Sequence, residues 1–143
     1  MNQHHTSRAR RHIVFSLKIA GAIIVSALLL TLARSQGWID QGQVVRAINI
    51  VIGLGMVAYA NVMPKFMHET PPRSLREATL AQAFGRVGSW AMTLGFLVWT
   101  ALWAFAPRDI AQVGSIAAVV ASMVVMFGYL AWKYAAFRKS ERQ

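Results

Sequence analysis

Residues 110–132 read IAQVGSIAAVVASMVVMFGYLAW, an apolar stretch without a single charged residue. It is longer than the about 20 apolar residues that a helix needs to cross a bilayer. Its apolar residues do not alternate with polar ones, as the strands of a membrane β-barrel require. Because lipid offers no partner to unpaired backbone groups, a segment of this kind must be helical. Residues 110–132 are therefore predicted to span a membrane.

Three further apolar stretches are predicted to be spans, the second of them shorter than the others and the weakest, so the chain is predicted to be an all-α integral membrane protein with four transmembrane helices. The other three spans are placed at about residues 13–33, 47–63 and 87–106. The first span is longer than the apolar region of a signal peptide, and it is expected to be a retained anchor rather than a cleaved signal. The membrane domain is placed at 13–132, between basic cytoplasmic tails at 1–12 and 133–143.

The composition agrees with a membrane protein. Hydrophobic residues make up 56% of the 143 residues and charged residues 14%, whereas soluble domains are about 25% charged. Fifteen Lys and Arg residues against five Asp and Glu residues give a net charge of +10. In so apolar a chain this charge indicates topology and attraction to anionic lipid rather than nucleic-acid binding. The absence of cysteine excludes disulfides, thiolate zinc sites and cysteine nucleophiles.

The basic residues are distributed unevenly along the chain. With both termini on one side of the membrane, twelve of the fifteen fall on that side, and the other side holds Arg34, Arg46 and Arg108. Cytoplasmic flanks of transmembrane helices carry the excess of Lys and Arg. Both termini and the 64–84 loop are therefore predicted to be cytoplasmic, in a bacterial inner membrane whose anionic inner-leaflet lipids attract the basic tails.

No catalytic set is visible in the sequence. The five acidic residues fall in predicted loops and tails, and no glycine-rich phosphate loop occurs. A proton-coupled transporter would usually carry a carboxylate at membrane depth, and the four predicted spans contain none. The chain is accordingly predicted not to be an enzyme, and no metal and no cofactor are expected.

The loop between the second and third spans carries a helix start signal. Ser74 is followed three residues later by Glu77, which is the pattern of a capping box. The residues from Leu75 to Phe84 then show one mild apolar side and one polar side. We therefore expect a short amphipathic helix along the inner membrane surface, acting either as a structural connector or as a surface that docks a partner.

Small residues recur at every fourth position on the fourth span. They are Gly114, Ala118 and Ser122. Spacing of this kind lets helix backbones approach closely in membranes. The stripe is expected to mediate helix packing, within the bundle as the first choice and between two copies of the chain as the second.

Two short motifs flank the inner loop. Residues 61–65 read NVMPK at the end of the second span, and residues 84–90 read FGRVGSW at the start of the third. Over about residues 53–105 the chain resembles the SdpI family of small bacterial membrane proteins, in which a span also ends in N-x-x-P-K. Residues 71–75, PPRSL, stand where that family has its loop motif, and Gly85 stands where it has a histidine.

The resemblance implies an immunity or signalling protein that acts by binding a protein partner. The residues assigned to the motif and to partner binding are Asn61, Pro64, Lys65, Arg73, Arg86 and Gly88. Two alternatives stay open beside it. The first is an accessory or scaffold subunit of a larger membrane complex, and the second, ranked last, is a small-molecule transporter.

Overall fold

The computed structural model describes residues 3–62 and 75–140, which form four α-helices. The helices are α1 (Gln3–Ser35), α2 (Gln41–Val62), α3 (Leu75–Phe105) and α4 (Arg108–Ser140). Each contains a segment that is long and apolar enough to cross a membrane, at Ile13–Ser35, Gln41–Val62, Phe84–Phe105 and Arg108–Arg138. The prediction of an all-α chain with four apolar, membrane-length helices is confirmed at this level.

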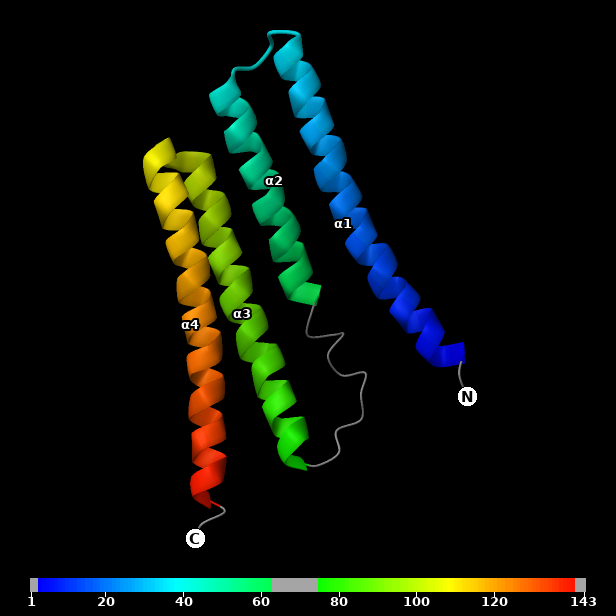
Figure 1. Cartoon of the computed structure of the whole chain (residues 1–143), viewed down its shortest axis with the longest axis vertical. Coiled ribbons are helices and arrows are strands. Elements are labelled where there is room, and N and C mark those ends of the chain that lie inside the picture. The colour runs from blue at the N-terminus through cyan, green and yellow to red at the C-terminus, as the bar shows by residue number, and fades with distance from the viewer. Residues whose placement is uncertain (1–2, 63–74, 141–143) are drawn as a thin grey trace.

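The helices lie side by side in chain order (Figure 1). The contact between α3 and α4 is the most extensive, followed by that between α2 and α3 and then that between α1 and α2. One end of the bundle, here called the terminal end, has the start of α1, the end of α2, the start of α3 and the end of α4 directed towards it (Figure 1). The α1–α2 and α3–α4 turns lie at the opposite, or turn, end. α1 diverges from α2 towards the terminal end (Figure 1).

A glycine in a left-handed conformation ends α1. Gly37 has a φ of 73°, a conformation that costs little only in a residue without a side chain. The backbone N–H of Trp38 donates to the carbonyl of Ala33 at 3.0 Å, and that of Gly37 donates to the carbonyl of Arg34 at 2.9 Å. This pair of bonds is the Schellman motif, which closes the helix and turns the chain towards α2.

A reciprocal capping box starts α2. The backbone N–H of Gln43 donates to Oδ1 of Asp40 at 2.8 Å, and the N–H of Asp40 donates to Oε1 of Gln43 at 2.9 Å. Both bonds satisfy groups that a helix start leaves without a partner. α2 consequently begins at Gln41, earlier than the predicted residue 47.

The separate amphipathic helix predicted for the inner loop is not observed. Residues 75–84 are instead the first turns of α3, which runs unbroken to Phe105. No proline occurs between 75 and 105 to interrupt the helix. Gly85 and Gly88 are both buried, so the packing of neighbouring residues offsets the low helix propensity of glycine. Ser74, the predicted cap, lies outside the described residues.

α1 and α4 also run further than the predicted spans. Residues 3–12, predicted to be a tail, continue α1 ahead of its apolar segment, and residues 133–140, predicted to be the other tail, continue α4, whose apolar segment runs to Arg138. Neither stretch contains glycine or proline, and Arg, Lys and Ala are good helix formers. Both helices therefore continue through these basic stretches without a break.

The enclosed core is small and is shared by α2, α3 and α4. Its buried apolar side chains are Ala60, Phe96, Trp103 and Ala111. Most other large apolar side chains are exposed, and the apolar segment of α1 is 0% buried. On a soluble protein so much exposed apolar surface would promote aggregation. Against lipid it needs no protein cover, which agrees with a multi-pass membrane protein.

Glycines set the closest approaches between neighbouring helices. A Cβ atom on Gly95 of α3 would collide with Oγ of Ser122 on α4, and one on Gly53 of α2 would collide with Oγ1 of Thr100 on α3. Gly55, also on α2, lies against isoleucines of α1. Each helix pair therefore meets at a position where one side chain is missing, as is typical of membrane helix contacts.

Candidate functional site

Arg46 joins α2 to the end of α3. Its Nη1 donates to the carbonyl of Ala104 at 3.2 Å and its Nη2 donates to the carbonyl of Ala106 at 2.9 Å. Carbonyls at a helix C-terminus lack partners within the helix, and a cation there is favoured by the helix dipole. Arg46 thus caps the C-terminus of α3 at the turn end, and this contact stabilises the packing of α2 against α3.

Other polar side chains inside the bundle are also bonded between or within helices. Nε1 of Trp99 on α3 donates to the carbonyl of Asn49 on α2 at 3.1 Å. Oγ of Ser89 on α3 donates to the carbonyl of Ala60 on α2 at 2.6 Å. The indole N–H of Trp103 is the exception, because it is buried without a hydrogen-bond partner among the described residues. The bonds of Trp99 and Ser89 therefore connect α3 to α2.

The small-residue stripe lies in the contact between α3 and α4 of one chain. A Cβ atom on Gly114 would lie 2.9 Å from Cδ1 of Leu102 on α3. Ser122 is 8% exposed and meets Gly95, and the Ala118 carbonyl lies 3.3 Å from the place that a Gly95 Cβ would take. The structure thus places these three positions against α3 of the same chain.

The residues assigned to the motif fall in different places. Asn61 is exposed on the last turn of α2. Gly88 is buried in α3, where a Cβ atom would lie 3.0 Å from Sδ of Met126. Arg86 is exposed and lines a groove between α3 and α4. The remaining motif residues, Pro64, Lys65 and Arg73, lie outside the described residues.

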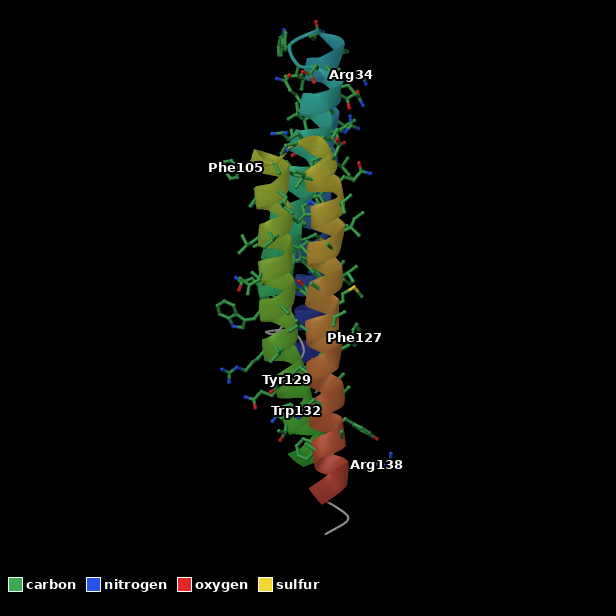
Figure 2. The ribbon with its side chains drawn as sticks, turned by 90° about the vertical axis from the view of Figure 1, so that its left-hand side faces the viewer. Arg34, Phe105, Phe127, Tyr129, Trp132 and Arg138 are labelled. Atoms are coloured by element: carbon green, nitrogen blue, oxygen red, sulfur yellow. The ribbon has the colours of Figure 1, made fainter. Side chains whose placement is uncertain are left out.

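The groove that Arg86 lines has a volume of about 650 Å³ and lies in the half of the bundle nearer the terminal end. Figure 2 looks onto α3 and α4 and shows Tyr129 and Trp132 on the lower part of α4. The α3 residues of its wall recur every three or four positions and so share one helix face. The full lining is Thr79, Gln82, Arg86, Val87, Trp90, Ala91, Leu94, Val125 and Tyr129.

A second, smaller hollow of about 170 Å³ lies where α2 ends against α3 and α4. Its lining includes Ala60, Gly88 and three methionines, Met92, Met123 and Met126. It is mainly apolar, because Ser89 is its one polar lining residue and donates its hydrogen bond to Ala60. Ala60, which directly precedes Asn61 in the chain, lines this hollow together with Gly88. Arg86 lines the larger groove instead.

Several of the described polar groups near the terminal end line the larger groove. Within residues 3–62 and 75–140, no cluster of three or more His, Asp or Glu side chains could hold a metal ion. The groove offers a guanidinium, an amide, two hydroxyls and an indole together with aliphatic side chains. Groups of these types form charge, hydrogen-bond and apolar contacts.

The sequence patterns do not predict this groove, and Arg86 alone of its lining is a predicted site residue. A signal is nevertheless present in α3. Thr79, Gln82 and Arg86 precede Trp90 at helical intervals, so one helix face changes from polar to aromatic and apolar. The contribution of Tyr129 depends on how α4 pairs with α3, and local spacing carries no information on that pairing.

Comparisons with protein-family models, with curated proteins and with solved structures find no match. The resemblance to the SdpI family therefore remains a prediction from the sequence.

Proposed function

We propose that this chain is a multi-pass protein of the bacterial cytoplasmic membrane that acts by binding a protein partner. Following the resemblance to the SdpI family, the role proposed for it is immunity or signalling. The observation that supports it is the contrast between the two kinds of polar residue. Arg46, Trp99 and Ser89 are bonded inside the bundle, whereas Asn61 is exposed at the end of α2.

The distribution of charge supports cytoplasmic termini. With both termini on one side, the order of the segments along the chain assigns twelve of the fifteen Lys and Arg residues to that side, and the turn end has Arg34, Arg46 and Arg108. One of those three, Arg46, is bonded to the α3 carbonyls. The two acidic residues of the turn end, Asp40 and Asp109, further reduce its positive charge. This bias is the one that orients helices with the basic side inside.

Single cysteines test the orientation, because the chain has none of its own. Arg138 is exposed near the end of α4, and Gln36 is exposed in the α1–α2 turn. In right-side-out spheroplasts we expect a membrane-impermeant maleimide to label the Gln36→Cys variant and to leave Arg138→Cys unlabelled. Permeabilised cells control for reactivity, and both variants are expected to react there. Labelling of Arg138→Cys alone in intact spheroplasts would contradict the proposed orientation.

Partner binding is tested by replacing the exposed amide of the motif. The tagged full chain is crosslinked in native membranes, and the captured proteins are identified by mass spectrometry. We expect one dominant partner, and we expect Asn61→Ala to reduce its recovery about fivefold, since one net hydrogen bond contributes about 1 kcal/mol.

Gln36→Ala is the matched control for Asn61→Ala. It also removes an exposed uncharged amide, but at the turn end, and it is expected to leave recovery of the partner unchanged. Equal recovery with Asn61→Ala and Gln36→Ala would remove the motif from the interface. The absence of any dominant crosslinked protein in the unmodified chain would overturn the proposed function itself.

The small-residue stripe bears on the alternative of an accessory or scaffold subunit, because such a stripe can also join one membrane protein to another. Gly114 and Ser122 contact Leu102 and Gly95 of the same chain. The stripe is therefore occupied within the bundle, and it no longer favours assembly with another subunit.

A further inference from the structure

The α3–α4 groove changes character along its length. Thr79, Gln82 and Arg86 line its part nearer the terminal end, and Trp90 and Leu94 line the part nearer the middle of the bundle. At a rise of about 1.5 Å per residue, the wall from Thr79 to Leu94 is about 22 Å long. Half of a bilayer including its headgroups has a similar thickness, about 20–22 Å. The groove thus changes from polar to apolar over a length comparable to the thickness of one leaflet.

Arg86 lies near the terminal-end boundary of the apolar segment of α3. The apolar segment of α3 is Phe84–Phe105, so Arg86 is within one turn of its boundary and Leu94 is about 12 Å deeper. Arg86 is exposed, and a planar guanidinium can donate two parallel hydrogen bonds to one phosphate. Trp90, which is 69% exposed, belongs to the aromatic residues that settle at membrane interfaces.

α4 adds aromatic groups and a second cation beside the groove. The rings of Tyr129 and Trp132 have centroids 5.9 Å apart, and Nζ of Lys133 lies 5.8 Å from the centroid of the Trp132 ring. Lys133 is one turn beyond Tyr129, about 40° from the same helix face. Among the residues whose side chains the structure describes, none that lines the groove is acidic. The charge is therefore complementary to an anionic headgroup rather than to a zwitterionic one.

We propose that the α3–α4 groove is a binding site for one anionic phospholipid. The phosphate lies at Arg86, with Lys133 at the mouth of the groove, and one acyl chain lies against Trp90, Leu94 and Val125. This site is separate from the proposed partner contact at Asn61, and it requires only that the terminal end of the bundle lies at a membrane interface.

The site is tested by native mass spectrometry of the full chain in mild detergent, titrated with phosphatidylglycerol and with phosphatidylcholine. We expect phosphatidylglycerol to bind at least about fivefold more tightly, and Arg86→Gln to weaken that binding about fivefold, as the loss of one interfacial cation implies. Arg138→Gln is the matched control. It removes an exposed cation of α4 that does not line the groove, and it is expected to leave the affinity unchanged.

A second pair of variants tests the acyl-chain path while keeping Arg86. Ala91 lines the middle of the groove, so Ala91→Phe is expected to fill it. The affinity for phosphatidylglycerol is expected to fall about fivefold, because the acyl chain of the lipid loses apolar contact with the groove. Ala101→Phe, on an exposed position of α3 outside the lining, is expected to leave that affinity unchanged. Circular dichroism establishes that each variant is folded.

Three results would overturn the proposal. The first is equal affinity of the unmodified chain for the two lipids, and the second is equal binding by Arg86→Gln and Arg138→Gln or by Ala91→Phe and Ala101→Phe. The third is displacement of phosphatidylglycerol by millimolar inorganic phosphate, which would identify a site for a free anion. None of these measurements involves Asn61 or a protein partner, so failure of this site is distinguishable from failure of the proposed function.

Discussion

Gly95→Val is expected to lower the free energy of unfolding by about 3 kcal/mol, at the upper end of what overpacking costs. A Cβ atom at this position would collide with Oγ of Ser122, and it would lie 3.1 Å from Cβ of Ser122 and 3.3 Å from the carbonyl of Ala118. The serine hydroxyl can rotate, but the Ala118 carbonyl belongs to the backbone of α4 and cannot. α3 and α4 must therefore separate, and they lose the most extensive contact of the bundle. Unfolding in mild detergent with increasing denaturant, followed by circular dichroism, measures the change.

Gly128→Val is the matched control for Gly95→Val. Both variants replace a glycine within a long helix, but a Cβ atom on Gly128 would meet nothing within 4 Å. We expect its free energy of unfolding to stay within about 0.5 kcal/mol of the unmodified chain, as for most exposed substitutions. Equal losses from the two variants would contradict the close approach of α3 and α4.

The same comparison separates the two roles that the sequence leaves open for the stripe of Gly114, Ala118 and Ser122. If the stripe packs within one chain, the loss caused by Gly95→Val does not depend on protein concentration. If the stripe joined two copies, substitution at Gly95 would weaken a dimer, and the loss would grow on dilution. The contacts of Gly95 with α4 favour the first result.

The four spans were predictable because lipid restricts the choice of structure so severely. An apolar run such as residues 110–132 can only be a helix in a bilayer, and no knowledge of its neighbours is needed. Helix ends depend on finer signals. The capping box of Asp40 and Gln43 is visible in the sequence as two residues three positions apart, yet a boundary drawn from hydropathy alone places the start of the second span at residue 47.

The faces of the helices were much harder to predict than the helices themselves. Trp103 is 6% exposed and Phe105 is 89% exposed, although both are large aromatic residues near the end of α3. In a soluble protein, the buried face of a helix is apolar and the exposed face is polar, so the sequence would distinguish the two positions. Lipid accepts apolar side chains on every face, so hydrophobicity does not distinguish the core from the membrane. The groove that places Tyr129 and Arg86 in one lining could therefore not be predicted from spacing.

Arg46→Ala is expected to lower the free energy of unfolding by about 2–3 kcal/mol, the range for hydrogen bonds from a charged donor. It removes both bonds to the carbonyls of Ala104 and Ala106, and no other donor to these two carbonyls is found among the described residues. The loss is measured by unfolding in detergent. Hydrogen exchange provides a second measurement, because we expect amides in the last turn of α3 to exchange faster while those in its middle do not.

The variants Arg46→Lys and Arg108→Ala distinguish two roles for Arg46. In one it caps α3, and in the other it only contributes to the charge difference across the membrane. Arg108 is exposed at the same end of the bundle, and its removal is expected to change stability by no more than about 0.5 kcal/mol. If Arg46 only balanced charge across the membrane, Arg46→Lys would keep full stability and Arg46→Ala would resemble Arg108→Ala. Because an ammonium group cannot reproduce the two-pronged geometry of a guanidinium, we instead expect Arg46→Lys to lose about half as much stability as Arg46→Ala.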